Sequence, residues 1–326
     1  MNNFAFTCGD INGIGPEIVI KAINKIVSLN HSGKLYVLCP ANVFYNTLQN
    51  VKPDFEFDIL KNHNKESNQL VSVINIGNVR QNLGKPSVTS GKTAYKSLSL
   101  AYDLLMSGKA NAVVTAPVSK TAINKAGYDF RGQTELYAKW TNTSNFVMTF
   151  LSQKINAALL TIHCSLKNVH NLINIKKLES TINVILKTLK YDLRISNPRI
   201  AVLGLNPHAG ENGIIGDEEG SIILPVIKKF RKTISIDGPF ASDAFFANQM
   251  FNGFDMTLGM YHDQILIPFK LLNFGQGVNY TAGLPIVRTS PDHGVAYDIA
   301  DKYIADESSI VQAYRYALRI VKNRQS

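Results

Sequence analysis

Short apolar runs that alternate with longer amphipathic segments are the feature that most restricts the fold of this chain. Runs such as "NAVVTAPV" at 111–118 and "NAALLTIH" at 156–163 are apolar on both faces. Strands with two apolar faces are typical of mostly parallel sheets that helices cover on both sides. The alternation therefore predicts an α/β fold.

The predicted elements follow this alternation along most of the chain. Strands are expected at 3–8, 34–39, 111–118, 146–152, 156–163, 199–206 and 254–262, and helices at 16–29, 91–108, 178–193, 218–232 and 310–323. Residues 52–70 are polar and weakly patterned, which indicates an irregular region or the edge of a sheet. The 326 residues contain no long linker, so two domains would be interleaved rather than strung out.

Composition excludes several classes of protein. The net charge of +10 comes from scattered lysines without a basic block, so we expect no nucleic-acid partner, although the charge suits a small anionic substrate. The three cysteines are widely spaced and form no C-x-x-C pair, which favours reduced thiols in a cytoplasmic compartment. No apolar run reaches the ~18 residues of a membrane span, so we expect no membrane partner.

Three of the seven histidines follow predicted strands. His163, His208 and His262 each stand at or just beyond the end of an apolar run. In open α/β sheets, ligands bind beyond the carboxyl ends of the strands. Three imidazoles there could hold a divalent metal with one open position, with Asp263 supporting His262. The residues alone leave open that each is a hydrogen-bonded structural histidine.

Glycine-rich segments exclude other chemistries. "CGDINGIGPEI" at 8–18 joins the first strand to the first helix, but Ile18 stands where the dinucleotide fingerprint needs its third glycine. "TSGKTA" resembles a phosphate-binding loop, but Pro86 occupies the place of its first glycine. No G-x-S-x-G hydrolase elbow is present. Lys270 and Arg288 lie near apolar segments and could clamp an anion, or could be ordinary surface charges.

The motifs together resemble the 4-hydroxythreonine-4-phosphate dehydrogenase family of pyridoxal phosphate (vitamin B6) biosynthesis. They are "GDINGIGPEI", "TAPVSKTAINKAG", "GQTE", "LGLNPHAGENGIIGDEE", "MYHDQILIPFK" and "VNYTAGLPIVRTSPDHGVAYDIA", in order from about residue 7 to residue 300. The first and last motifs also look like the broader isopropylmalate-dehydrogenase type of fold. The resemblance implies two α/β/α domains with mostly parallel sheets around a central cleft. Residues 1–132 plus 285–326 would form the NAD side, and 133–284 would hold the metal and the dimer contacts.

The resemblance also implies a homodimer with its active site at the interface, NAD, and a divalent metal (Zn, Mg or Co). The implied metal ligands are His163, His208 and His262, the third supplied by the partner subunit. The implied substrate contacts are Gln133, Thr134, Lys270, Asn279 and Arg288, and the NAD contacts are His293 and Asp298. A carboxylate at Asp298 would contact the ribose hydroxyls and favour NAD over NADP. Many members of the family read Gly-His-Thr-Glu where this chain has Gln133, and glutamine cannot become cationic.

The reaction so implied is oxidation of 4-phosphohydroxy-L-threonine to 2-amino-3-oxo-4-phosphooxybutanoate, which decarboxylates to 3-amino-2-oxopropyl phosphate. The metal would act as a Lewis acid on the C3 hydroxyl while hydride leaves for the nicotinamide. Asp243 is a candidate base because apolar residues flank it, and the alternative is that it caps a helix. Other phosphorylated hydroxy acids (4-phosphoerythronate or 4-phosphothreonate) are alternative substrates. A metal-dependent hydrolase and a non-catalytic binding module are the remaining alternatives.

Overall fold

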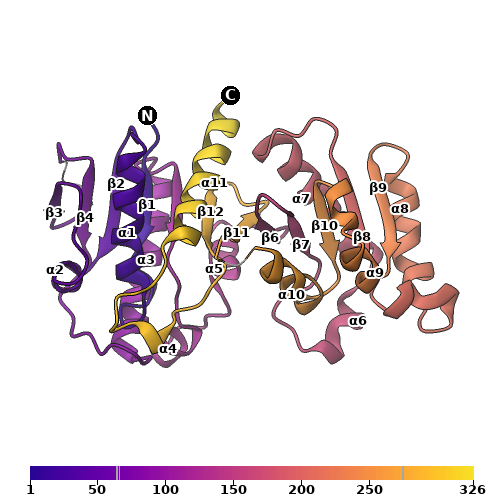
Figure 1. Cartoon of the computed structure of the whole chain (residues 1–326), viewed down its shortest axis with the longest axis horizontal. Coiled ribbons are helices and arrows are strands. Elements are labelled where there is room, and N and C mark those ends of the chain that lie inside the picture. Colours follow the sequence, from indigo (N-terminus) through magenta and orange to yellow (C-terminus); the bar gives the residue numbers. More distant parts are fainter. Residues whose placement is uncertain (64, 66, 274) are drawn as a thin grey trace. The chain divides into compact units, whose positions relative to one another are not determined.

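The computed structural model describes residues 1–63, 65, 67–273 and 275–326, which group into two units (Figure 1). The first unit contains Met1–Tyr137 and Ile286–Lys322, and the second contains Ala138–Pro285 and Asn323–Ser326. The chain thus leaves the first unit and returns to it. Within the described residues, none of the helices is both long and apolar enough to span a bilayer.

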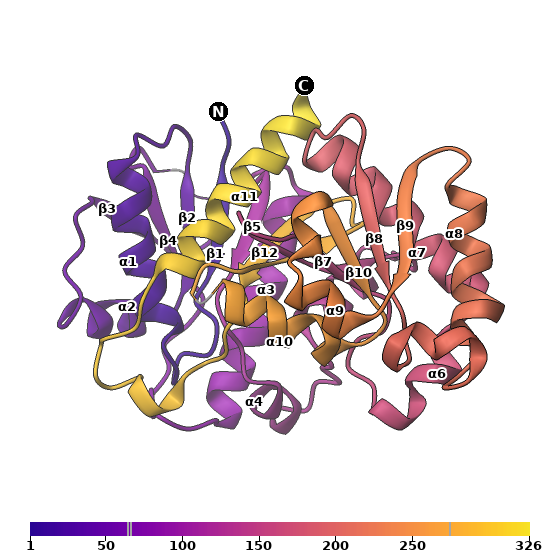
Figure 2. The same cartoon turned by 45° about the vertical axis from the view of Figure 1, so that its right-hand side comes forward.

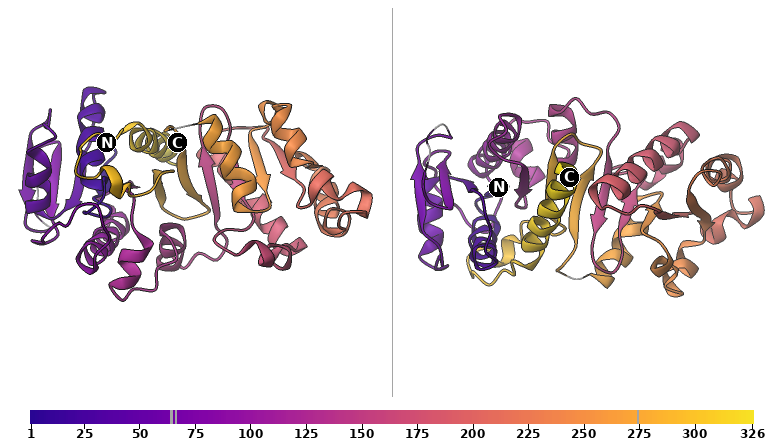
Figure 3. Two further views of the ribbon diagram at one scale, coloured as in Figure 1. Left: turned by 60° about the horizontal axis from the view of Figure 1, so that its bottom comes forward. Right: turned by 90° about the horizontal axis from the view of Figure 1, so that it is seen from above.

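The first unit is built on parallel strands in the order β3-β4-β2-β1-β5-β12. These are β1 (Phe4–Thr7), β2 (Leu35–Cys39), β3 (Phe57–Leu60), β4 (Val71–Asn75), β5 (Ala112–Thr115) and β12 (Val287–Pro291). The helices are α1 (Gly15–Ser28), α2 (Ala41–Leu48), α3 (Val88–Met106), α4 (Lys120–Lys125), α5 (Gln133–Trp140) and α11 (Ser308–Gln325). Helices α1 and α3 lie on opposite faces of the strands (Figure 3), which accounts for the strands' two apolar faces.

The second unit has the strand order β11-β6-β7-β10-β8-β9. Its strands are β6 (Val147–Leu151), β7 (Ala157–Leu159), β8 (Arg199–Leu203), β9 (Ser235–Phe240), β10 (Met256–Gly259) and β11 (Val278–Ala282). Strand β6 runs antiparallel to both of its neighbours, and the other pairs are parallel. The helices are α6 (Val169–Leu172), α7 (Ile175–Lys187), α8 (Leu224–Phe230), α9 (Ser242–Ala247) and α10 (His262–Leu272). Helices α9 and α10 lie in front of the strands in Figure 2, with α7 behind them.

Both units therefore confirm the predicted α/β class with mostly parallel strands. All seven predicted strands and all five predicted helices are present, although β3, β4, β9, β11, β12 and several short helices were not predicted. Predicted helix 218–232 begins with a π-helical turn at Glu219–Ile223, and predicted helix 178–193 ends in another at Thr188–Asp192. Strand β3 lies at the edge of the first unit's sheet, as the weak pattern of 52–70 indicated, although residues 64 and 66 of that segment lie outside the described residues.

Helix α10 is held against the second unit's sheet by its apolar face. Ile265 and Phe269 have no exposed surface and pack in one cluster with Leu159 of β7 and Leu203 of β8. Full burial of side chains of this size contributes about 1.5–3 kcal/mol each. The helix therefore keeps a fixed position beside the carboxyl ends of these strands, and it begins at His262.

Candidate active site

The three predicted metal ligands follow three neighbouring parallel strands of the second unit. Strand β10 lies between β7 and β8, and Leu258 aligns with Ala158 on one side and Val202 on the other. In-register parallel strands end at the same edge of a sheet. His163, His262 and His208 come four, three and five residues after the ends of β7, β10 and β8. The topology thus delivers all three to one edge.

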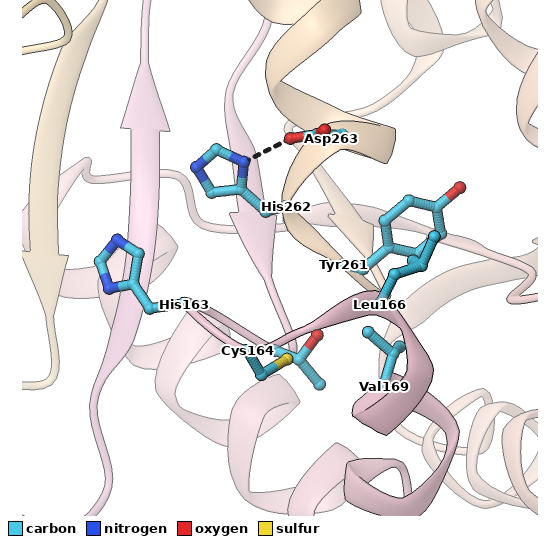
Figure 4. Close-up of a pocket in the computed structure, with 8 residues that line it drawn as sticks. His163, Cys164, Leu166, Val169, Tyr261, His262 and Asp263 are labelled. Atoms are coloured by element: carbon cyan, nitrogen blue, oxygen red, sulfur yellow. Dashed lines mark hydrogen bonds and ion pairs between the residues drawn. The ribbon is translucent and has the colours of Figure 1, made fainter.

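His163 and His262 lie side by side within one chain. Their ring centroids are 6.2 Å apart, and both line a cavity of about 320 Å³ together with Thr161, Cys164 and Asp263 (Figure 4). Nδ1 of His262 lies 2.7 Å from Oδ1 of Asp263. A carboxylate on one ring nitrogen fixes the tautomer and leaves the other nitrogen available to a metal.

His208 stands in a segment of unusual backbone. Its φ and ψ are 51° and 27°, and the left-handed conformation continues through Ala209, Gly210, Glu211 and Asn212. Left-handed backbone costs about 1–2 kcal/mol for each residue other than glycine. His163 is also left-handed, with φ 46°. Strain of this kind persists only where the surroundings hold it, and it concentrates at functional sites.

Among the residues that the structure describes, no group of three His, Cys, Asp or Glu is placed to hold a metal ion. The structure therefore brings His163 and His262 together but does not add His208 to them in one chain. Two converging imidazoles fit a site for a metal that prefers nitrogen ligands, such as zinc or cobalt. Completing such a site takes a further donor.

Gln264 links the strand ends that precede His208 and His262. Its side-chain amide donates to the carbonyl of Gly204 at 2.6 Å, and its carbonyl accepts from the amide of Met260 at 2.6 Å. Gln264 is buried, so these bonds are shielded from competing water. The ends of β8 and β10 are thereby fixed to each other.

A groove of about 450 Å³ runs along α10 from His262. It is lined by His262, Asp263, Leu266, Ile267, Lys270 and Leu271. Ile267 and Leu271 are 59% and 81% exposed, which is unusual for large apolar side chains that lie together. Lys270, a predicted substrate contact, is also exposed, and it lines the same groove as His262. Asn279, another predicted contact, is half-buried on β11.

The first unit contains a buried guanidinium. Arg288, on β12, is 2% exposed, and its Nε and Nη2 donate to Oγ1 of Thr115 at 3.1 and 2.9 Å. Nη2 also donates to Oε1 of Gln133 at 3.0 Å. Burial lowers the pKa of Arg288 to about 10, opposed by the charges of Tyr137 and Glu135. Arg288 thus stays cationic at neutral pH.

Gln133 and Thr134 begin α5 beside this guanidinium. Nε2 of Gln133 donates to the carbonyl of Ala116 at 3.3 Å, and Thr134 is buried at 2% exposure. A helix start next to a buried cation is suited to an anion such as phosphate. The structure therefore brings together Gln133, Thr134 and Arg288, three of the five predicted substrate contacts.

The predicted NAD segment packs on the glycine loop of the first unit. A Cβ at Gly13 would lie 2.5 Å from the carbonyl oxygen of Val295, so only glycine permits this approach. The hydroxyl of Tyr297 donates to Asp10 at 2.8 Å, and burial raises the pKa of Asp10 against the hydrogen bonds that it accepts. His293 is half-buried. Asp298 lies within the turn Tyr297–Ile299 and is exposed. Asp298 is thus accessible to a ligand.

One expectation about side-chain surroundings does not hold. Asp243 is exposed in the first turn of α9, because Phe245 and not Asp243 faces the core. The burial on which its choice as base relied is therefore absent. Cys164, next to His163, is half-buried, and its sulfur points away from His163 (Figure 4).

Sequence reasoning missed Gln264, Thr115 and Glu219. Thr115 ends β5 and Gln264 follows His262 by two residues, so each adjoins a predicted motif. Glu219 belongs to a run of acids at 217–219 that no motif assigns to a site, although acids there could cap the next helix. Its carboxylate instead accepts hydrogen bonds from Leu205 and Asn206, just before His208. An acid that directly follows a glycine-rich segment was the available signal in the sequence.

These features define a class of protein: an α/β protein of two units, with a buried arginine beside a helix start in one unit and a pair of histidines beyond strand ends in the other. A family model described as pyridoxal phosphate biosynthetic protein PdxA matches residues 31–317. The chain belongs to this family, which confirms the resemblance drawn from its motifs. It is an enzyme of pyridoxal phosphate biosynthesis and an oxidoreductase.

Individual relatives match over their full length. A 4-hydroxythreonine-4-phosphate dehydrogenase from Sulfurihydrogenibium sp. is 38% identical over 326 residues, which cover 100% of both chains. The crystal structure of such an enzyme from Klebsiella pneumoniae has a TM-score of 0.82 at 35% identity, with 98% of each chain covered. A protein from Oceanobacillus iheyensis, named a D-threonate 4-phosphate dehydrogenase, is 35% identical and covers 98% of this chain and 97% of its own.

A more distant match concerns the fold alone. Isocitrate dehydrogenase from Methylococcus capsulatus has a TM-score of 0.53 at 15% identity, covering 100% of this chain and 87% of its own. This likeness places the chain in the broader fold class that its first and last motifs indicated.

Proposed function

We propose that this chain oxidises 4-phosphohydroxy-L-threonine with NAD and a divalent metal. The product is 2-amino-3-oxo-4-phosphooxybutanoate, which loses carbon dioxide to give 3-amino-2-oxopropyl phosphate. The observation that carries the proposal is the end-to-end match to a 4-hydroxythreonine-4-phosphate dehydrogenase. Two local arrangements support it: the Arg288 anion site and the paired His163 and His262.

The phosphate of the substrate binds at Arg288, Gln133 and Thr134. Burial keeps water away from the guanidinium, so its attraction to a phosphate is stronger than at an exposed site. Thr115 and Gln133 hold the guanidinium in one orientation before the substrate arrives. Preorganised donors cost little reorganisation when the ligand binds. Lys270 and Asn279 contribute further polar contacts to the substrate.

His163, His208 and His262 hold the metal, with Asp263 orienting the ring of His262. When bound, such a metal acts as a Lewis acid that lowers the pKa of the substrate hydroxyl. Asp298 is exposed to accept hydrogen bonds from ribose hydroxyls, and its charge disfavours a 2′-phosphate, so NAD is preferred to NADP. Bound NAD would accept the hydride. Asp243 remains the candidate base from sequence, without support from burial.

The active enzyme is a homodimer in which the partner chain completes the metal site. One chain pairs only two of the three histidines. The exposed Ile267 and Leu271 lie in the same groove as His262, so a second copy that covers these apolar side chains would also reach the site. A second copy is the partner that explains both features.

Mixed dimers test this assembly. His208→Ala and His262→Ala variants, each inactive alone, are expected to regain activity when they are unfolded and refolded together. If the two histidines of a site come from different chains, one of the two sites in each mixed dimer is intact, so about one quarter of the activity returns. The pair His163→Ala with His262→Ala then shows whether His262 is the ligand that crosses. No recovery in either mixture would mean that each site is built within one chain.

The reaction itself is tested with purified protein, NAD, a divalent metal and 4-phosphohydroxy-L-threonine. We expect an increase in the absorbance of reduced NAD that requires all three additions. A second candidate substrate is 4-phosphothreonate, favoured by the match to the Oceanobacillus iheyensis protein and by the uncharged Gln133 beside Arg288. Faster turnover of 4-phosphothreonate or 4-phosphoerythronate would reassign the substrate. Hydrolysis without NAD would contradict the proposal altogether.

A further inference from the structure

The carboxylate of Glu219 is buried against the residues that lead into His208. Glu219 is 5% exposed. Its Oε1 accepts from the backbone amides of Leu205 and Asn206, each at 2.7 Å. Its Oε2 accepts from Nδ2 of Asn206 at 2.9 Å. One carboxylate therefore holds the two residues between Gly204 and Pro207 by three hydrogen bonds.

Two glycines make room for this carboxylate. A Cβ at Gly210 would lie 2.7 Å from Oε2 of Glu219, and a Cβ at Gly204 would lie 3.0 Å from Oε1. Gly204 precedes His208 and Gly210 follows it. The carboxylate thus contacts the chain on both sides of the histidine, and side chains at either position would displace it.

The segment around His208 needs such support. Four residues other than glycine adopt left-handed backbone there, and His208 is the first of them. Gly204, the first residue after β8, is held by two other hydrogen bonds. Its carbonyl accepts from the side chain of Gln264, and its amide donates to the carbonyl of Phe240 at 2.8 Å. Glu219 extends that anchorage by two residues, up to the residue before Pro207.

Helix capping does not explain Glu219. The hydrogen bonds that it accepts come from residues thirteen and fourteen positions earlier in the chain. Glu219 opens a π-helical turn, Glu219–Ile223, and such turns occur frequently at functional sites. The neighbouring Glu218 accepts from Nδ2 of Asn206 at 2.7 Å, whereas the backbone amides of Leu205 and Asn206 donate to Glu219.

We propose that Glu219 is a positioning residue for the metal ligand His208. By holding the amides of Leu205 and Asn206, it fixes the left-handed segment in the one conformation that presents the imidazole to the metal. This inference rests on the proposed metal site. Its consequence is that metal affinity depends on a carboxylate that does not touch the metal.

The test is Co²⁺ binding by the full-length protein. Binding is measured by equilibrium dialysis and by the visible absorption spectrum of the bound ion. Glu219→Gln can keep one oxygen on both backbone amides, but it removes the negative charge from these bonds and sets an amide donor against Nδ2 of Asn206, so part of the anchorage is lost. We expect Co²⁺ affinity to fall by about 10- to 100-fold, the range found when groups behind a ligand are removed. NAD affinity, which depends on the other unit, should stay unchanged.

Glu218→Gln is the matched control, because it alters the adjacent acid and leaves the backbone amides bonded. Its effect on Co²⁺ affinity should be less than about threefold. In a His208→Ala background, with Co²⁺ raised to the range that the remaining histidines need, Glu219→Gln should have no further effect on affinity, because there is no imidazole left to position. If Glu219→Gln does not fold, Glu219→Asp is measured in its place; it keeps the charge but is too short to reach both amides.

Co²⁺ affinity and spectrum equal to those of the unchanged chain would overturn the role of Glu219. An equal loss in the presence and absence of His208 would also overturn it, since the effect would then not pass through that ligand. Failure of the metal site itself gives a different pattern: the unchanged chain would bind no Co²⁺, or His208→Ala would bind it normally.

Discussion

Replacing His208 with alanine is expected to remove the bound metal and to lower kcat/KM by about a thousand-fold or more. A metal that polarises the substrate oxygen contributes several kcal/mol to the barrier, and each ~1.4 kcal/mol is a factor of ten. His208 is exposed and left-handed, so its ring contributes little to the core. The loss should therefore appear in metal content and rate, with little change in the free energy of unfolding.

His170→Ala is the matched control for this prediction. His170 is also exposed in the second unit, but it lies within α6 and not in a segment that directly follows a strand of the sheet, as His208 does. It should keep normal metal content and rate. Metal content and activity retained by His208→Ala would show that the three-histidine interpretation is wrong. Loss of both in His170→Ala would point to a general effect of removing a histidine from this unit.

The central strands could be predicted because their runs of apolar residues are stable only when buried. Strand β12 and helix α10 were not predicted. Strand β12, Val287–Pro291, contains an arginine that is polar in sequence yet fully buried, because Thr115 and Gln133 satisfy it. Helix α10 carries Pro268 in its interior, and its first residue, His262, was predicted as the last residue of the strand at 254–262. In both cases tertiary contacts outweigh local propensity.

The histidines of the candidate site could be predicted from their common place after apolar runs. Which of these histidine rings lie together within one chain could not be predicted, because this depends on the register of β7, β10 and β8. The left-handed backbone at His208 has no sequence signature beyond its glycines, since Ala209 and Glu211 normally avoid that region. Glu219 escaped prediction because its partners lie more than a turn away and are backbone amides.

Replacing Gln133 with glutamate is expected to raise the KM for the phosphorylated substrate by about a hundred-fold or more. Oε1 of Gln133 lies 3.0 Å from Nη2 of Arg288, so a carboxylate there would pair with the guanidinium and cancel its charge. It would also repel the phosphate; two like charges about 4 Å apart interact with roughly 4 kcal/mol at an effective dielectric constant of about 20. The KM for NAD should not change, and neither should metal content.

Gln133→Met separates charge from hydrogen bonding at this position, because methionine has a similar length and no strong acceptor. It should raise the substrate KM by about tenfold, the value of one hydrogen bond to a charged group. The free energy of unfolding gives a second distinction. Gln133→Glu loses the bond to the carbonyl of Ala116 but supplies the buried Arg288 with a countercharge that offsets this loss, whereas Gln133→Met loses the same bond, leaves one donor of Arg288 unsatisfied and should destabilise the fold. If Gln133→Glu binds the substrate normally, Arg288 is a structural cation, and the phosphate is recognised by other residues.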